Sequence, residues 1–383
     1  MFNASIKRLN NITFELKIDR LNKFITLVAL VLLVACKKQE KKERISQSNT
    51  SITALKYAEG FTIISGEHSK IIEINSPWPN ANKVFTHEFL NEELPINEIV
   101  VTSTTHIPAL ELLGVAHTLV GFPGTDYVSS KKTRARIESG AVRELGKNEG
   151  INTEVLLELQ PDIVIGFGVD GSNRTFETIK KSGIPVIYNG DWVKNSPLAK
   201  AEWIKFFGVL FNKEKEADSI FNEIELNYLN AKELAATVST APTIVSGALH
   251  KDVWYLPSGT SPEAQFLKDA NVNYLWKDTS GQGSLALNFE TVYEKGSNAD
   301  IWLSPSYYAS LEALNQANEH YSKFKAFKNK MVYSFSTTTG ATGGVTYYEM
   351  GFARPDLVLK DIIKICHQEL LPDYQTNFFK PLK

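Results

Sequence analysis

Cysteine is scarce in this chain. Its 383 residues include two, Cys36 and Cys366. Two cysteines cannot build the multi-disulfide framework that holds small secreted domains together. Stability must therefore come from large hydrophobic cores. The chain is long enough to form more than one, because single cores usually stop growing near ~250–300 residues.

An excess of positive charge is also missing. The net charge is -2, and 22% of the residues are charged. No run of one sign extends beyond a short lysine-rich stretch near residue 40. A nucleic-acid-binding surface normally shows a marked basic excess, so that class of function is excluded.

The familiar catalytic motifs are absent as well. There is no Gly-x-Ser-x-Gly elbow, no His-Glu-x-x-His helix and no cysteine–histidine constellation. The glycine-rich loop Ser334–Val345 lacks the Gly-Lys-Ser/Thr ending of a nucleotide-binding P-loop. The seven histidines are scattered, which disfavours a direct metal site. We expect a binding protein rather than an enzyme. An exported enzyme with a carboxylate pair is the alternative left open, because such pairs cannot be identified without a fold.

The N-terminus has the layout of a secretory signal. Five basic residues precede an apolar run, Phe24–Ala35, that is too short to span a ~30 Å hydrocarbon core. The run ends in Leu-Val-Ala-Cys, which resembles a lipoprotein lipobox with Cys36 as the acylated residue. We predict a signal over 1–36 and a flexible tether over 37–50, a segment with one aliphatic residue and no aromatic. A short membrane anchor with an incidental cysteine is the alternative.

The rest of the chain divides by pattern. Alternating apolar and polar residues over 51–94 predict an antiparallel β extension. Strand–helix alternation over 95–195 and 241–383 predicts two α/β lobes with mostly parallel, helix-covered sheets. Between them, 196–240 shows helical periodicity and predicts one or two long helices, with Pro197 at the first helical position.

Several ordered stretches resemble one protein family. They are a strand, polar loop and helix over 98–114, a helix followed by Pro161-Asp162-Ile163-Val164-Ile165, and Ala299-Asp300-Ile301-Trp302-Leu303 in the second lobe. From about Asn97 to the C-terminus the chain resembles the periplasmic binding proteins for iron–siderophores, cobalamin and heme, whose two lobes are joined by a long helix.

The resemblance implies a function. The chain is expected to be an extracytoplasmic, lipid-anchored solute-binding protein, a monomer with no cofactor of its own. It would deliver a ferric siderophore to an ABC permease and its ATPase subunits. Cobalamin or another corrinoid, or heme, is the alternative cargo. An aromatic cleft poor in arginine would favour the corrinoid, and charged or hydroxyl-lined walls the siderophore.

Loops at the carboxyl ends of the strands should line the cleft between the lobes. Their aromatic rings could stack on a flat chelate, and their polar groups could hydrogen-bond to it. These loops are Ser103–His106, Pro123–Tyr127, Phe167–Arg174, Asn189–Trp192, Trp254–Gly259, Ser304–Tyr308 and Ser336–Tyr347. The candidate contacts within them are Thr105, His106, Tyr127, Phe167, Arg174, Trp192, Trp254, Tyr308 and Thr338.

Two further sets of charged residues are candidates for contacts with a ligand or a permease. Four arginines are expected in loops of the first lobe, where each could pair with an anionic chelate or remain a solvated charge: Arg134, Arg136, Arg143 and Arg174. In the family, one surface glutamate per lobe docks on the permease. By position, Glu177 and Glu312 are the candidates, and a plain solvated charge is the alternative for both.

Overall fold

Short runs of valine and isoleucine form the central sheet of the N-terminal lobe, because branched side chains pack well on both faces of a parallel sheet. The computed structural model describes residues 50–75, 77–148, 150–168, 173–193, 196–281 and 283–383. Ile99 and Val101 enter one hydrophobic core, and Val100 between them enters a second core on the opposite face. The strands lie in the order β11–β10–β5–β6–β7, all parallel: β5 (Ile99–Val101), β6 (Leu119–Phe122), β7 (Arg143–Glu144), β10 (Ile163–Phe167) and β11 (Val186–Asn189).

Helices cover this sheet, as the alternating pattern predicts. α4 and α5 supply Leu156 and Phe176 to the core on one face. α4 ends where Gln160 takes a left-handed conformation, with φ 47°. The helices of this lobe are α2 (Ile107–Leu112), α3 (Lys131–Glu138), α4 (Thr153–Leu159) and α5 (Arg174–Lys181), and a small hairpin joins β8 (Gly146–Lys147) to β9 (Gly150–Ile151).

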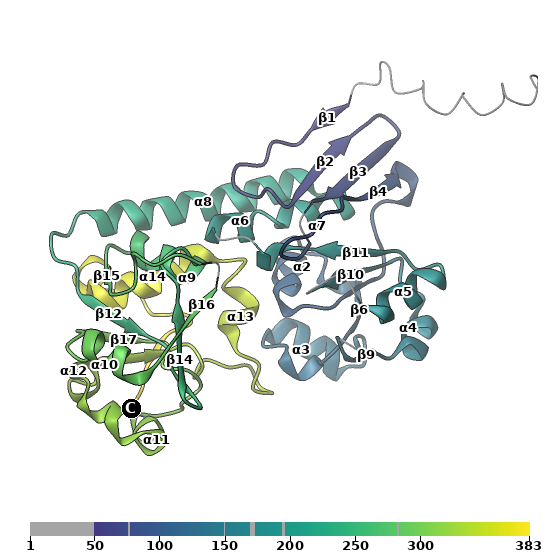
Figure 1. The fold of residues 1–383 in the computed structure, drawn as a ribbon. Coiled ribbons are helices and arrows are strands. Elements are labelled where there is room, and N and C mark those ends of the chain that lie inside the picture. The colour runs from purple at the N-terminus through teal and green to yellow at the C-terminus, as the bar shows by residue number, and fades with distance from the viewer. Residues whose placement is uncertain (1–49, 76, 149, 169–172, 194–195, 282) are drawn as a thin grey trace, which may run out of the picture. The chain divides into compact units, whose positions relative to one another are not determined.

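The linking segment is broken into three helices rather than the one or two predicted. Pro197 does open the first of them, within its first turn. The chain then turns at Asn212, whose φ of 53° is left-handed and cannot continue a helix. The helices are α6 (Pro197–Ala201), α7 (Ile204–Leu210) and the 23-residue α8 (Glu214–Ala236). α8 packs against both α7 and α14 and so connects the two lobes (Figure 1).

The C-terminal lobe has a second mainly parallel sheet and a smaller antiparallel one. The first has the order β15–β12–β17–β18–β19 and is parallel except for its last strand. The stretch Val253–Pro257 belongs to the antiparallel sheet β13–β14–β16 instead of the expected strand–helix alternation. The strands are β12 (Thr243–Ser246), β13 (Ala248–His250), β14 (Val253–Pro257), β15 (Asn273–Tyr274), β16 (Ser284–Leu287), β17 (Ile301–Leu303), β18 (Val332–Ser334) and β19 (Lys380–Pro381).

An aromatic core holds this lobe together. Trp254 and Trp302 stack with ring centroids 5.5 Å apart, and Phe324 packs on both. The surrounding helices are α9 (Pro262–Asp269), α10 (Phe289–Gly296), α11 (Leu311–Ala317), α12 (Lys325–Lys328), α13 (Thr346–Met350) and α14 (Pro355–Cys366). Cys366 is partly buried against the same core, in keeping with the small apolar role that its apolar-periodic segment predicts.

The predicted antiparallel extension is confirmed. Its strands pair in sequence order: β1 (Ser51–Ile52), β2 (Phe61–Ser65), β3 (Ser69–Ile74) and β4 (Phe85–Leu90). One face joins the core of the N-terminal lobe, where Phe61 lies 4.4 Å from Trp203 between ring centroids.

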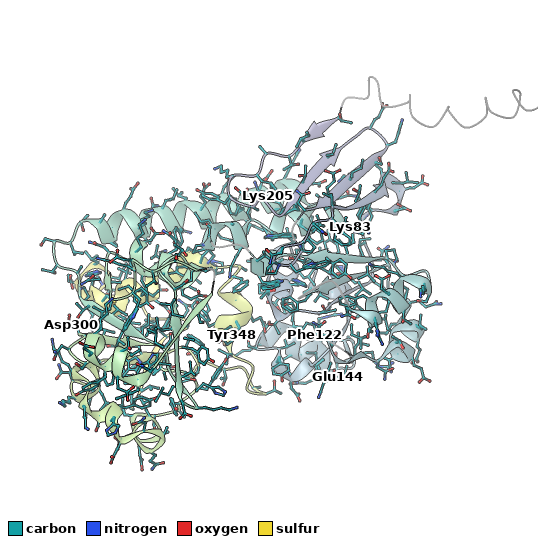
Figure 2. All side chains as sticks on the ribbon, in the orientation of Figure 1. Lys83, Phe122, Glu144, Lys205, Asp300 and Tyr348 are labelled. Atoms are coloured by element: carbon teal, nitrogen blue, oxygen red, sulfur yellow. The ribbon has the colours of Figure 1, made fainter. Side chains whose placement is uncertain are left out.

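A buried carboxylate anchors the start of the extension. Glu202, which is fully buried, accepts hydrogen bonds from the backbone N–H groups of Lys56, Tyr57 and Ala58 at 2.8–2.9 Å. Lys205, labelled in Figure 2, balances its charge at 3.1 Å. The extension is therefore fixed to the linking segment by hydrogen bonds as well as by apolar packing.

His87 in β4 predicts acid sensitivity of this region. Burial, with help from the positive charge of Lys180, lowers the pKa of His87 from 6.5 to about 4. The native state then keeps His87 neutral while the unfolded chain binds a proton, so stability falls as the pH drops from about 6.5 toward 4. As the pH drops through this range, we expect the free energy of unfolding of His87→Gln to fall by on the order of 2 kcal/mol less than that of the parent. Denaturant unfolding at pH 7 and pH 4.5 checks this, and equal losses in the two proteins would contradict it.

The predicted signal, Cys36 and nearly all of the tether lie outside the described residues. Within the ranges given above, no helix is both long and apolar enough to cross a membrane.

Candidate functional site

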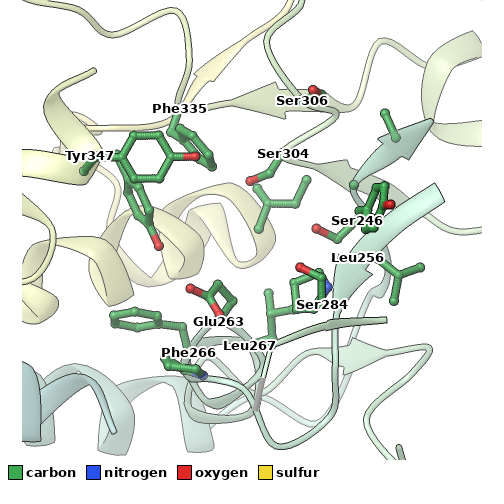
Figure 3. A pocket seen from close by; sticks show the side chains of 18 of the residues that line it. Ser246, Leu256, Glu263, Phe266, Leu267, Ser284, Ser304, Ser306, Phe335 and Tyr347 are labelled. Atoms are coloured by element: carbon green, nitrogen blue, oxygen red, sulfur yellow. The ribbon is translucent and has the colours of Figure 1, made fainter. Parts of the chain in front are cut away.

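A cavity of about 520 Å³ opens beside the C-terminal lobe and is closed on one side by residues from outside it. The C-terminal lobe provides most of the wall, including Tyr255 of β14, Leu303 of β17 and Glu263 of α9. The N-terminal lobe, the extension and α6 add Trp192, Pro79 and Lys200. Figure 3 shows Ser304, Phe335 and Tyr347 on one side of the space and Glu263, Phe266 and Leu267 of α9 on the other.

The wall carries eight aromatic rings and four serine hydroxyl groups. Flat aromatic faces suit a ligand with an apolar or conjugated face. The aromatic residues are Trp192, Tyr255, Phe266, Tyr307, Phe335, Tyr347, Tyr348 and Phe379. The serines are Ser246, Ser284, Ser304 and Ser306.

Two tyrosines of this wall, Tyr347 and Tyr348, remain neutral phenols. Burial raises the pKa of Tyr347 well above its ordinary value of 10. Burial, together with a hydrogen bond to Tyr307, also raises the pKa of Tyr348, and the two hydroxyl oxygens lie 2.9 Å apart. These groups can donate hydrogen bonds to a ligand but do not offer phenolate oxygens at neutral pH.

Few charged side chains line the cavity. Lys200, Glu263 and His250 line it, whereas no described arginine contributes to the wall. A ligand carrying several negative charges would find little compensation there.

Of the nine predicted contacts, Trp192 is the one that lines this cavity. Trp192 follows β11 at the carboxyl edge of the sheet, the edge at which ligand contacts are predicted. Phe167, another predicted contact, lies behind it with ring centroids 5.5 Å apart. The two aromatic side chains therefore form a pair in which Trp192 faces the space and Phe167 supports it.

The structure corrects the predictions for Trp254 and His106. Trp254 is fully buried, and its indole N–H donates to the carbonyl of Ser246 at 2.9 Å, so it is a core residue. His106 is fully buried against Phe207, and burial lowers its pKa despite the opposing charge of Asp191. Neither side chain reaches a surface at which a ligand could bind.

Two predicted ligand loops contact each other through their backbones, while the side chain of Tyr127 stays 73% exposed. A Cβ at Gly344 would lie 2.1 Å from the carbonyl oxygen of Tyr127, so the two backbones touch. The hydroxyl of Thr342 donates to the carbonyl of Asp126 at 2.8 Å. Thr338 donates to the carbonyl of Phe378 at 2.6 Å and braces the same loop. This side of the predicted cleft is closed.

Glu349 completes the contact between the lobes. Its carboxylate, 1% exposed, accepts hydrogen bonds from the backbone N–H groups of Ser129 at 2.6 Å and Ser130 at 3.0 Å. Burial raises the pKa of this carboxyl, although the two N–H groups oppose the shift. α13 of the C-terminal lobe is thereby attached to a loop of the N-terminal lobe.

The other predicted contacts lie away from the large cavity. Thr105 borders a void of about 20 Å³ beside Asp191 and Lys200. Tyr308 packs against Tyr321, and Arg174 is exposed in the first turn of α5.

The remaining arginines have structural partners. Arg134 and Arg136 lie in α3 rather than in a loop, and both donate to backbone carbonyls, those of Thr125 for the first and of His117 and Leu119 for the second. Arg143 lies 3.7 Å from the carboxylate of Glu158. Their guanidinium groups serve the N-terminal lobe itself.

Sequence reasoning missed several wall residues. Lys200 and Glu263 lie in helices that follow Pro197 and Pro262, and the predicted cleft was drawn from loops alone. Both residues lie near the start of a helix, where a strand-end loop leads into it, and this position could have marked them as wall residues.

A second, more polar cavity of about 1190 Å³ adjoins the first. The two share Pro79 and Val193. The extension lines it with Tyr57 and Trp78, and the C-terminal lobe adds polar side chains. In the part of the chain that the structure describes, no group of three or more histidine, cysteine or carboxylate side chains could hold a metal ion.

Comparison with known proteins identifies the fold. Residues 99–337 match the model of a family described as periplasmic binding protein. An uncharacterized lipoprotein of Methanocaldococcus jannaschii, MJ0878, is 27% identical over 296 residues, which is 75% of this chain and 69% of the relative.

Two solved structures share the fold at low sequence identity. A possible iron-binding (periplasmic solute-binding) protein of Staphylococcus epidermidis aligns with a TM-score of 0.54 and 18% identity, covering 71% of this chain and 98% of the other. The periplasmic heme binding protein HutB of Vibrio cholerae aligns with a TM-score of 0.53 and 16% identity, covering 69% and 99%.

Proposed function

Because the chain belongs to the periplasmic binding protein family, we propose that it is the extracytoplasmic solute-binding component of an ABC importer. In this proposal acylated Cys36 anchors it to a membrane. The observation that carries the proposal is the aromatic cavity between the C-terminal lobe and Trp192. A cavity of about 520 Å³ lies within the usual range of small-ligand sites, roughly 300–1,000 Å³.

The cargo we propose is an iron complex of low net charge, such as a ferric hydroxamate. The hydroxyl groups of Ser304 and Ser306 can hydrogen-bond to its polar rim, and neutral phenols can donate to its oxygens. The absence of arginine from the described wall argues against a highly charged complex such as a catecholate. The Staphylococcus epidermidis protein with the same fold is described as possibly iron-binding, which supports this class.

A tetrapyrrole is the second candidate, favoured by one specific observation. Eight aromatic residues line the cavity, and a conjugated macrocycle stacks well on such faces. The Vibrio cholerae protein with the same fold binds heme. A corrinoid would also need the adjoining cavity, because it is larger than a heme.

Glu177 and Glu312 are proposed to dock on the permease. Both are exposed and lie in the first turn of a helix, one in each lobe. Each has a partner within its own helix, Lys180 for Glu177 and Gln316 for Glu312, and these exposed contacts are weak enough to be exchanged for an arginine of a permease.

Calorimetric titration tests the proposal. The compact unit Ser51–Lys383 is titrated with ferrichrome, ferric enterobactin, ferric citrate, hemin and cyanocobalamin. We expect saturable 1:1 binding with a Kd near or below micromolar for ferrichrome or hemin, and weaker binding of ferric enterobactin. If no member of this panel binds, the iron and tetrapyrrole assignments both fail.

A further inference from the structure

Lys200 is a buried lysine whose ammonium group has no ion-pair or hydrogen-bond partner among the described residues. The side chain is 9% exposed. Among the residues that the structure describes, its ammonium forms neither an ion pair nor a hydrogen bond, and it lies over the ring of Phe352, 3.8 Å from Nζ to the centroid. Burying a cation without a counter-ion costs free energy, so the placement of Lys200 requires an explanation.

The neighbouring helix shows how the fold normally treats such a group. Lys205 is equally buried, at 7% exposed, and its ammonium lies 3.1 Å from Glu202 and 3.2 Å from Asp218. The fold thus supplies carboxylates to Lys205 and none within bonding distance to Lys200. The difference points to a partner for Lys200 that comes from outside the chain.

The position of Lys200 fits such a partner. It lines the 520 Å³ cavity together with Trp192 and Tyr347. The indole N–H of Trp192 is buried and also has no acceptor among the described residues. A ligand oxygen with negative charge is the complement of the unpaired ammonium.

Two carboxylates limit how much charge the site accepts. Glu263 lines the same cavity, and Asp191 lies behind Lys200 with one oxygen unpartnered among the described residues. Burial lowers the pKa of Lys200, whereas both carboxylates act to raise it and so favour the charged ammonium. With Glu263 in the wall, the cavity suits one anionic group rather than several.

From this geometry, and resting on the proposed function, we propose that Lys200 determines specificity by binding a single anionic oxygen group of the cargo inside the cavity. The group would be a carboxylate, such as a heme propionate or a carboxylate arm of a hydroxamate siderophore. The ring of Phe352 holds the ammonium in place while the cavity is empty.

Matched ligand pairs test this directly in the unit Ser51–Lys383, which contains all three hydrophobic cores. The pairs are hemin with its dimethyl ester, and N-succinyl ferrioxamine B with N-acetyl ferrioxamine B. We expect the acid-bearing member to bind roughly 10- to 100-fold more tightly, the range for a charge-assisted hydrogen bond. In Lys200→Met this preference should disappear while the neutral member keeps its affinity within about threefold.

Two controls separate binding from folding. Lys215→Met, an equal charge change on the exposed face of α8, should leave the preference intact. Lys200→Met should melt at the same temperature as the parent or higher, because a buried charge has been replaced by an apolar chain of similar length. Equal weakening of both members of a pair, or no weakening of either, would overturn the role of Lys200.

A probe independent of the cargo separates this inference from the proposed function. Sodium benzoate, which carries one carboxylate, is titrated into the parent and Lys200→Met, with the thermal midpoint as the readout. If no chelate binds but benzoate stabilises the parent alone, Lys200 is an anion site and the proposed cargo is wrong. If chelates bind and Lys200→Met behaves as the parent, the cargo proposal holds and this inference is refuted. If neither chelates nor benzoate have an effect, both fail.

Discussion

Trp254→Ala is expected to lower the free energy of unfolding by about 3–5 kcal/mol, the usual cost of removing a large buried aromatic side chain. Trp254 is fully buried, stacks on Trp302 and donates its indole N–H to Ser246. The cavity left by alanine cannot be filled by its rigid aromatic neighbours. Denaturant unfolding measures the loss.

Trp192→Ala is the matched control, since it changes the same side chain at the cavity wall. Trp192 is partly exposed and packs on Phe167 alone among aromatic rings of the described residues. We expect a stability change within about 1 kcal/mol and a loss of ligand affinity of roughly tenfold or more. If Trp254→Ala leaves the unfolding free energy unchanged, or weakens binding more than Trp192→Ala does, the assignment of the two tryptophans is wrong.

Glu349→Ala is the second variant for which we expect a large loss of stability, because it weakens the contact between the lobes. The substitution leaves the buried N–H of Ser129 and the partly buried N–H of Ser130 without an acceptor. Each such group costs about 1–3 kcal/mol, so we expect a loss of about 2–4 kcal/mol. Amide hydrogen exchange should accelerate at Ser129, at Ser130 and in α13.

The control for this variant is Glu138→Ala, which removes an exposed carboxylate at the end of α3 in the N-terminal lobe that Glu349 contacts. It should change neither stability nor exchange measurably. Unchanged exchange at Ser129 in Glu349→Ala would show that the backbone contacts at Gly344 hold the lobes together without the carboxylate.

Periodicity was enough to predict most of the fold. The runs of valine and isoleucine in β5 and β10 can only be buried on both faces, and the alternation in β2 and β3 predicts a sheet with one buried face. The small antiparallel sheet was missed because the β13–β14 hairpin turns at Lys251, with φ 57°, and lacks the glycine or asparagine that normally marks such a turn.

The site could be predicted only in part, and the two tryptophans show why. Both lie near a strand end, and which of the two rings is buried depends on packing that the local sequence does not record. In β14 the alternation of side chains turns Trp254 inward and Tyr255 toward the cavity, a register that depends on pairing with β13 and β16. The closed side of the cleft depends likewise on two loops more than 200 residues apart, whose contact no local pattern records.

The attachment of the extension has a practical consequence for how the molecule is divided. The family match begins at residue 99, yet β2 and β3 contribute Phe61 and Ile72 to the core beneath the N-terminal sheet. A recombinant chain started at the family boundary would expose that core to water and leave Glu202 buried without the amides it accepts from. Such a chain should collect in inclusion bodies, whereas one started at Ser51 keeps these contacts.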